Sequence, residues 1–325
     1  MVREIAYFEA LREALREEML KDETVFVMGE DIKLGYIFGV TRGLAEEFGE
    51  ERVRDTPISE NTLVGAGLGA AITGTRPVVE IMFADLLCLA MDQLVNEIAK
   101  LRYITGGQIE KIPLVVRTPL GVWKGYGATH SQSLESWFVH VPGLKVVIVS
   151  TPYDAKGLLK SAIRDDNPVL FFEHKSLYRM TGPVPEEEYL IPLGKADIKR
   201  EGEDVTIISY GLMLHRTLSA AKKLEEDGIN VEVVDPRTLF PLDLKTILDS
   251  VKKTGRLVIV EEDCKTGGFG AEIAARVVEE AFDFLDAPIK RVATPDVPIP
   301  FSPVLEEAVL PKEEDIVKAV KEVVL

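Results

Sequence analysis

The stretch RDTPISENTLVGAGLGAA, residues 54–71, decides how this chain is interpreted. A short β-like run leads into a carboxylate, Glu60, and a glycine-laced apolar segment follows at once. Glycines at 65, 67 and 69 remove side chains from a helical segment, which allows a neighbouring helix or a bound cofactor to approach closely. A dinucleotide-binding fingerprint would need a strand directly before the first glycine, and the acidic SEN stands there instead. Taken alone, Glu60 is an acid favoured by the dipole at a helix N-terminus.

Strand-like and helical patterns alternate on both sides of this stretch. Residues 24–31, 76–83, 111–119, 144–150 and 168–174 are short apolar runs, and the first ends in Glu30 and Asp31. Residues 1–22 have the period of an amphipathic helix, residues 85–107 indicate one long helix, and residues 153–165 indicate another. The alternation predicts an α/β protein with parallel sheets covered by helices.

A change in amino-acid composition divides the chain into two parts. Residues 180–204 are rich in proline, glycine and charge and lack a core period, so we assign residues 181–195 as a linker. Three further strand-like runs follow at 205–211, 229–236 and 256–263, separated by helical segments. GGFG at 267–270 feeds a helix, either as an ordinary tight turn or as an anion cradle.

Length and composition exclude several classes of protein. A chain of 325 residues is too long for one small core. Its net charge of −16 argues against nucleic-acid binding and suits a basic protein partner or solubility alone. Arg76, Glu80 and Asp85 interrupt the best membrane-span candidate, and Cys88 and Cys264 form no disulfide framework or cysteine-rich metal site.

The charged start is unlike a secretory signal, so we expect a cytoplasmic protein. Three glutamines beside many Glu, Lys and Arg hint at a thermophile.

One histidine stands out. His130 lies in the glycine-rich loop 120–133 after a strand-like run, where binding residues concentrate. A surface or hydrogen-bonded structural histidine is the alternative. The sequence has neither a Walker phosphate loop nor a paired His/Cys metal spacing.

The motifs taken together resemble a known family over nearly the whole chain. They are VFVMGED, GVTRGL, RDTPISE, RPVVEIMFAD, MDQLVNEIAKLRY, ATHSQS, PGLKVV, STPYDAKGLLKSAIRDDNPV and EEDCKTGGFGAEIA. This set resembles the β subunit of the thiamine-diphosphate-dependent decarboxylating component of 2-oxoacid dehydrogenases, a family that includes pyruvate, branched-chain and acetoin dehydrogenases. The resemblance implies a pyrimidine-binding thiamine-type domain over 1–180, the linker, and a transketolase C-terminal-like domain over 196–325.

The resemblance gives Glu60 and His130 roles. Glu60 matches the glutamate that hydrogen-bonds the aminopyrimidine ring of the cofactor and favours the tautomer that removes the thiazolium proton. A dry site that raises the pKa of this carboxyl would help. His130, in ATHSQS, matches the histidine that supports the substrate carbonyl or the incoming lipoyl group.

The resemblance also implies partners. Thiamine enzymes hold the diphosphate and Mg²⁺ through a Gly-Asp-Gly segment followed by an asparagine, and this pattern is missing here. In the family the α subunit carries it, so this chain would hold half a site and act in a heterotetramer of two α and two β subunits. A lipoyl acyltransferase core would be a further partner.

Two further sets of residues match family positions. SAIRDDNP matches a structural potassium loop, with a plain turn as the alternative. Its implied ligands are Leu114, Ala162, Ile163, Asp165 and Asn167. Glu30 and Asp92 match acids that line a passage between two cofactor sites.

The sequence departs from the family pattern in the pocket. Leu86 replaces an aromatic residue near the cofactor pyrimidine, and Trp123 and Lys124 replace small residues. We expect oxidative decarboxylation of a 2-oxoacid, first pyruvate, with acetoin and branched-chain 2-oxoacids open. A split transketolase, with Lys124 and Arg117 as a thin phosphate-binding set, and a non-catalytic assembly protein are the alternatives.

Overall fold

The computed structural model describes residues 2–35 and 38–324, and the chain divides into two compact units. Unit 1 comprises Met1–Leu120 and Trp137–Leu193, and unit 2 comprises Gly121–Ser136 and Gly194–Leu325. The loop that carries His130 therefore groups with the C-terminal unit. Both units are built on mainly parallel sheets with helices, which confirms the α/β class.

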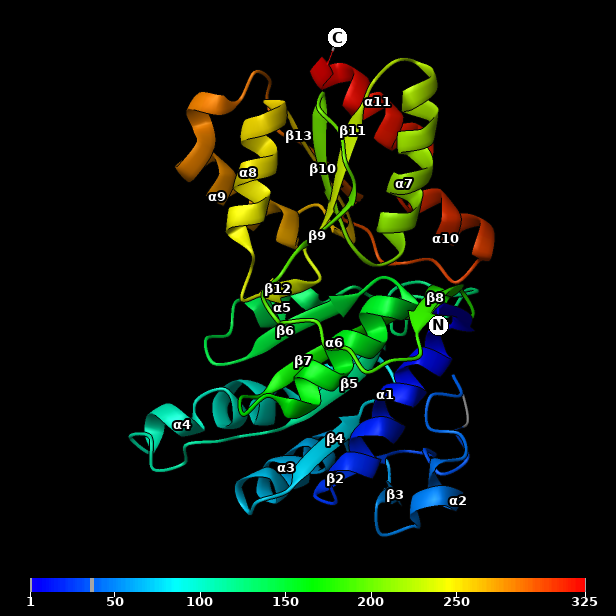
Figure 1. The fold of residues 1–325 in the computed structure, drawn as a ribbon, viewed down its shortest axis with the longest axis vertical. Coiled ribbons are helices and arrows are strands. Elements are labelled where there is room, and N and C mark those ends of the chain that lie inside the picture. The colour runs from blue at the N-terminus through cyan, green and yellow to red at the C-terminus, as the bar shows by residue number, and fades with distance from the viewer. Residues whose placement is uncertain (1, 36–37, 325) are drawn as a thin grey trace. The chain divides into compact units, whose positions relative to one another are not determined.

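Unit 1 is organised by a parallel sheet (Figure 1). Six of its strands lie in the order β6 (Lys145–Val149), β7 (Val169–His174), β5 (Val115–Leu120), β4 (Arg76–Glu80), β2 (Val25–Gly29) and β3 (Val53–Asp55). Every residue of β2, β5 and β7 is buried. A parallel sheet covered on both faces needs such continuous apolar runs, and this is why the sequence showed them.

Helix α1 (Tyr7–Lys21) packs along α6 (Pro152–Arg164) in unit 1. The buried ammonium groups of Lys156 and Lys160 pair with Glu17 of α1. The guanidinium of Arg164 pairs with Glu18. Helices α2 (Leu44–Phe48), α3 (Glu60–Ile72) and α5 (Glu135–Val139) and the 3₁₀ turn η3 (Lys175–Leu177) are the other regular helical segments in this part of the chain.

The expected helix over residues 1–22 begins later than predicted. The first residues form a strand, β1 (Val2–Ala6), before the helix begins. This strand pairs antiparallel with β8 (Thr181–Pro185), which lies within the segment assigned as a linker. The two strands form a separate two-stranded sheet held by backbone hydrogen bonds, so the pair needs no apolar period that a sequence would reveal.

The expected long helix over 85–107 is also not regular. It consists of a 3₁₀ segment η1 (Ala84–Ala90), a π segment η2 (Asp92–Ile98) and the short α4 (Leu101–Ile104). The Ala99 amide bonds to the Leu94 carbonyl five residues back, and the Lys100 ammonium donates to the Val95 carbonyl at 2.5 Å. The first of these, a backbone bond five residues long, is the pattern of a π-helix and shifts the helical register by one residue.

Unit 2 contains a five-stranded sheet. Its order is β14 (Lys290–Thr294), β13 (Leu257–Cys264), β10 (Val205–Ser209), β11 (Val231–Asp235) and β9 (Asp197–Arg200), and only the edge pair β11–β9 is antiparallel. The short strand β12 (Thr238–Phe240) follows β11.

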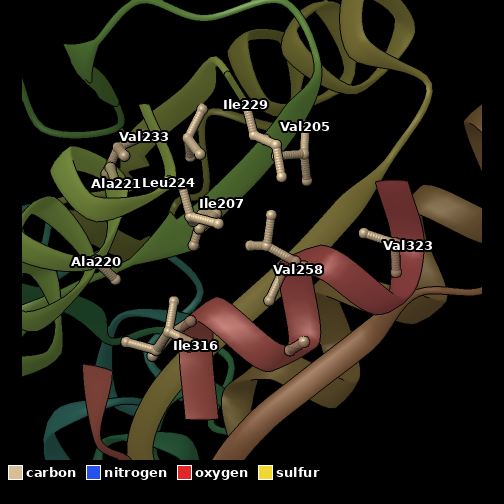
Figure 2. Packing of buried hydrophobic residues seen from close by; sticks show 14 of the residues in the cluster. Val205, Ile207, Ala220, Ala221, Leu224, Ile229, Val233, Val258, Ile316 and Val323 are labelled. Atoms are coloured by element: carbon tan, nitrogen blue, oxygen red, sulfur yellow. The ribbon is translucent and has the colours of Figure 1, made fainter. Parts of the chain in front are cut away.

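Helices cover both faces of this sheet (Figure 1). Helices α7 (Gly211–Glu226) and α11 (Glu313–Val324) lie on one face, and α8 (Leu244–Thr254) and α9 (Phe269–Ala281) lie on the other. Figure 2 shows Ile207, Val258 and Ile316 packing together in the core under α7 and α11. The 3₁₀ turn η4 (Phe282–Phe284) and α10 (Pro303–Val309) complete the unit. Within residues 2–35 and 38–324, no helix combines the length and hydrophobicity that crossing a membrane requires.

Candidate active site

The carboxyl edge of the unit 1 sheet brings together three residues singled out in the sequence. Glu30 directly follows β2, Glu60 opens α3 after β3, and Leu86 lies in η1 after β4. These three strands are parallel neighbours, so their carboxyl ends meet at the edge where open α/β sheets bind ligands. Burial, and then the neighbouring Glu60 charge, raise the pKa of Glu30 above its usual value. The two acids therefore lie close enough for their charges to interact.

Glu60 is the first residue of α3 and is only 5% exposed. The preceding Ser59 places its hydroxyl on Thr62, 2.9 Å away, and its carbonyl accepts the Leu63 amide at 2.8 Å. The helix N-terminus thus presents its positive end to a buried carboxyl.

The glycines after Glu60 serve packing at two positions out of three. A Cβ on Gly67 would lie 2.6 Å from a methyl of Val79 in β4, and a Cβ on Gly65 would lie 2.9 Å from the Gln93 amide oxygen. A Cβ on Gly69 would meet nothing within 4 Å. The close approach predicted from the sequence is therefore an approach of α3 to β4 and η2.

A narrow pocket lies beside Glu30. It is bordered by Glu30, Thr41, Glu80 and Met82 among others, and its volume is about 10 Å³. That volume holds about one water molecule. Leu86 is half-buried in η1.

Asp92 lies at the start of η2. It is exposed, and its carboxylate accepts a hydrogen bond from the Asn96 amide at 2.7 Å. The passage that the resemblance assigned to Glu30 and Asp92 stays a prediction.

Arg117 is engaged inside the protein. It is 1% exposed, and its guanidinium donates to both oxygens of Glu173 at 2.7 and 2.5 Å and also to Glu80. The Tyr178 hydroxyl donates to Glu173 at 2.6 Å. Two carboxylates already neutralise this cation, so Arg117 is not placed to bind a substrate phosphate.

His130 is half-exposed on a loop of unit 2. Its Nδ1 lies 3.0 Å from the Thr129 hydroxyl, and its backbone amide donates to the Gly127 carbonyl at 3.2 Å. Earlier in the same loop, the Trp123 ring stacks on Tyr126 with 5.3 Å between ring centroids. The Lys124 ammonium lies 5.0 Å from the Trp123 ring centroid. The two residues that depart from the family pattern therefore contact each other.

A cluster of buried carboxyl groups in unit 2 was missed from the sequence. Glu261 is fully buried, and burial raises its pKa to about 7. Burial, and then the Asp263 charge, raise the pKa of Glu135 well above its usual value. Asp263 has its own pKa raised by burial, and it accepts a hydrogen bond from Ser136 at 2.6 Å. The signal was the acidic run that ends the apolar strand at 257–264.

The glycine turn before α9 binds one of these acids. The Gly270 amide in the first turn of α9 donates to Glu261 at 2.7 Å. GGFG is therefore a turn that leads into a helix, as predicted, and a backbone donor in it binds a carboxylate of the chain itself.

The candidate potassium ligands gather near the C-terminal end of α6. The carbonyls of Ile163 and Asp165 both accept from Arg76 at 3.1 Å, and the Asp165 carboxylate accepts from Lys145 at 2.5 Å. Asn167 donates to the same carboxylate at 2.9 Å.

The other two potassium ligands also have partners. The Ala162 carbonyl accepts the Asp165 amide at 3.2 Å, and the Leu114 carbonyl accepts the Val169 amide at 2.9 Å. A carbonyl oxygen has two lone pairs, so these all-oxygen donors still fit a hard cation. Within the described residues, no group of three or more His, Cys, Asp and Glu side chains could hold a metal ion.

Comparison with known domains first defines the class. Residues 3–181 match the transketolase pyrimidine-binding domain, and residues 194–316 match the transketolase C-terminal domain. A solved structure described as "Split gene transketolase, inactive beta4 tetramer" has a TM-score of 0.81 and 26% identity, with 98% of both chains covered. The architecture is therefore that of the transketolase-like proteins.

Curated relatives then define the family. The 2-oxoisovalerate dehydrogenase subunit beta of Bacillus subtilis (strain 168) is 48% identical over 98% of both chains. The pyruvate dehydrogenase E1 component subunit beta of Porphyra purpurea is 51% identical over 98% of this chain and 96% of that one. The acetoin:2,6-dichlorophenolindophenol oxidoreductase subunit beta of Bacillus subtilis (strain 168) is 48% identical over 99% and 98%. The chain belongs to the family of β subunits of thiamine-diphosphate-dependent 2-oxoacid dehydrogenase E1 components.

Proposed function

We propose that this chain supplies half of the active site of an enzyme that oxidatively decarboxylates a 2-oxoacid, and that pyruvate is this 2-oxoacid. The lipoyl disulfide is the oxidant: one sulfur takes the acyl group, the other takes a proton, and carbon dioxide leaves. The observation that supports the proposal is the buried Glu60 beside Glu30 at the carboxyl edge of the sheet, where the pKa of Glu30 is raised. The similar identities to pyruvate, 2-oxoisovalerate and acetoin enzymes leave the choice of substrate to experiment.

Thiamine diphosphate supplies the electron sink for the decarboxylation when it is bound. Glu60 would bind the aminopyrimidine ring nitrogen and share a proton with it, because its carboxyl is buried at the first residue of α3. Glu30 would lie beside this pair, and burial and the Glu60 charge raise its pKa. Leu86 would give the ring an apolar contact.

His130 would act on the substrate side of the reaction. Its ring would donate a hydrogen bond to the substrate carbonyl or to the lipoyl sulfur. The ring is half-exposed, which leaves it accessible to a lipoyl arm.

The proposal includes partners that complete the site. An α subunit would hold the diphosphate and Mg²⁺, and two α and two β subunits would form a heterotetramer that delivers acyl groups to a lipoyl acyltransferase core. We place this assembly in the cytoplasm. The buried ion pairs of Lys156 and Lys160 between α6 and α1 support a thermophilic source, because the penalty for desolvating charges falls as temperature rises.

Potassium binding at the α6 end is a separate proposal. The carbonyls and the Asp165 carboxylate form an all-oxygen donor set at a helix C-terminus, where the dipole favours a cation. We expect the melting temperature to be higher in KCl than in tetramethylammonium chloride at equal ionic strength. The difference should disappear in Asp165→Asn, and equal melting temperatures for the wild type in both salts would exclude the site.

Reconstitution tests the main proposal. The chain is mixed with its α partner, thiamine diphosphate and Mg²⁺, and turnover is measured with pyruvate, 3-methyl-2-oxobutanoate and acetoin, each also with the chain alone. We expect activity only in the mixture, and activity of the chain alone would reject the half-site. Glu60→Gln should abolish turnover, whereas Glu51→Gln, an exposed control nearby, should not. Turnover of Glu60→Gln within a few-fold of the wild type would reject the assigned role.

A split transketolase is the second candidate, because the solved structure with a TM-score of 0.81 is of that kind. Its sugar-phosphate substrate would call for basic groups, and Arg117 is already bound by Glu173 and Glu80. Turnover of a sugar phosphate, with none of a 2-oxoacid, would favour this candidate.

A further inference from the structure

The loop that carries His130 is closed on itself and fixed at two points in unit 2. The Gly121 amide donates to the Gln132 carbonyl at 3.1 Å, which closes the base of the loop. The Val122 amide donates to a Glu262 oxygen at 2.7 Å, and the Gly125 amide donates to a Glu306 oxygen at 2.5 Å. The two acids come from β13 and α10.

Both contacts are buried and close. Glu262 is 7% exposed and Glu306 is 5% exposed. Val122 packs in an apolar cluster with Ile299 and Leu310. Gly125 has φ +77° and lies so close to the segment before α10 that a Cβ there would be 2.4 Å from a backbone oxygen. The loop backbone therefore fits directly on the surface that presents the two carboxylates.

A carboxylate that accepts a backbone amide makes a stronger bond than a neutral acceptor, and it lacks competing water when buried. Removing the acceptor would leave a buried amide unpaired, which costs more than an average hydrogen bond. Gly125 is five residues before His130, and the turn in which Gly127 accepts the His130 amide lies between them. The anchor at Gly125 therefore fixes the start of the turn that carries the histidine.

We propose that Glu306 and Glu262 are positioning residues for His130, holding the loop 121–132 in the conformation that presents the histidine ring. This inference rests on the role given to His130 under the proposed function. Neither acid needs to touch the substrate, because each acts through the backbone of the loop.

The first test needs no activity. Trp123 lies on the loop, and Trp137→Phe leaves it as the sole tryptophan of the chain. In this background we expect acrylamide to quench Trp123 at least twofold more strongly in Glu306→Ala than in the parent protein. Glu306→Gln, which keeps an acceptor, should lie between them. Glu307→Gln is the matched control, because Glu307 is adjacent but exposed and pairs with Arg216.

The second test separates positioning from general stability. With the α partner, decarboxylation is measured with an artificial electron acceptor and compared with acylation of a lipoyl domain. We expect Glu306→Ala to lower the rate of lipoyl acylation by roughly tenfold, because the histidine would then spend less time in the presenting conformation. The KM for the 2-oxoacid should stay near the wild-type value, and the melting temperature should fall only by the few degrees that one lost buried hydrogen bond costs. Glu262→Gln should give a weaker loss of acylation.

The outcomes distinguish the anchoring of the loop from the positioning of His130. Equal quenching of Trp123 in Glu306→Ala and in the control would overturn the anchoring of the loop. Increased quenching with unchanged lipoyl acylation, or an equal loss in both partial reactions, would overturn the positioning role. A wild-type assembly without activity would overturn the proposed function and the role of His130, while the quenching result would still decide whether the acids anchor the loop.

Discussion

Glu261 should control how the stability of unit 2 depends on pH. Its side chain is fully buried, and one carboxyl oxygen accepts hydrogen bonds from the Gly270 amide at 2.7 Å and from the Tyr210 hydroxyl at 3.2 Å. Burial outweighs these donors and raises the pKa to about 7, with a further contribution from the Asp263 charge. The charge of Arg291 acts in the opposite direction.

The sign and the magnitude follow from proton linkage. The folded state binds the Glu261 proton more tightly than the unfolded chain does, so it holds more protons between pH 4.5 and pH 7. Stability should therefore fall as pH rises through this window, and the loss should be complete above pH 7. A pKa of about 7 in place of 4.5 corresponds to about 3 kcal/mol.

Urea unfolding at pH 5 and pH 8.5 measures this effect. Glu261→Gln keeps an acceptor for Gly270 and Tyr210 but does not titrate, so it should match the wild type at pH 5. It should exceed the wild type by up to about 3 kcal/mol at pH 8.5. Some pH dependence should persist, because burial also raises the pKa of Glu135. The exposed Glu272→Gln is the control, and a Glu261→Gln protein that is no more stable than the wild type at pH 8.5 would refute the reasoning.

Four further substitutions test the site and its support. His130→Ala should lower lipoyl acylation by about a hundredfold with an unchanged melting temperature; unchanged acylation would count against its role. Arg117→Leu leaves the fully buried Glu173 unpaired and should destabilise unit 1 by about 3–5 kcal/mol in urea unfolding, and a loss below about 1 kcal/mol would contradict this. Gly67→Ala should destabilise by about 1–3 kcal/mol because of its contact with β4, whereas Gly69→Ala should be neutral or stabilising. Equal effects of the two glycine substitutions would show that the packing argument is wrong.

The sequence predicted the elements whose side chains are buried on all sides. Strands β2 and β7 are continuous apolar runs because both faces of the parallel sheet are covered. The positions of Glu30 and Glu60 at one edge then follow from the direction of the strands. This part of the site was predictable because it depends on topology and not on particular contacts.

The elements that were missed depend on backbone contacts or on contacts distant in sequence. The β1–β8 pair is a separate two-stranded ladder, and the irregular segment 84–104 contains backbone bonds such as that of the Ala99 amide to the Leu94 carbonyl five residues back. The Glu262–Val122 contact joins residues 140 positions apart, so no local sequence pattern predicts it. The acidic run at the end of β13 could be recognised in the sequence, but the residues that contact it could not.

The buried charges of the chain are of two kinds, and the difference bears on function. Between α1 and α6, the buried ammonium of Lys156 is paired with the partly exposed carboxylate of Glu17, which compensates its charge. In unit 2, burial acts on Glu135, Glu261 and Asp263 together, and it raises the pKa of all three. Acids in such a cluster reduce their mutual repulsion by binding protons, and Glu261 does so near neutral pH. The unit that carries the loop of His130 is therefore the one whose stability should respond to pH in the range where a histidine also titrates.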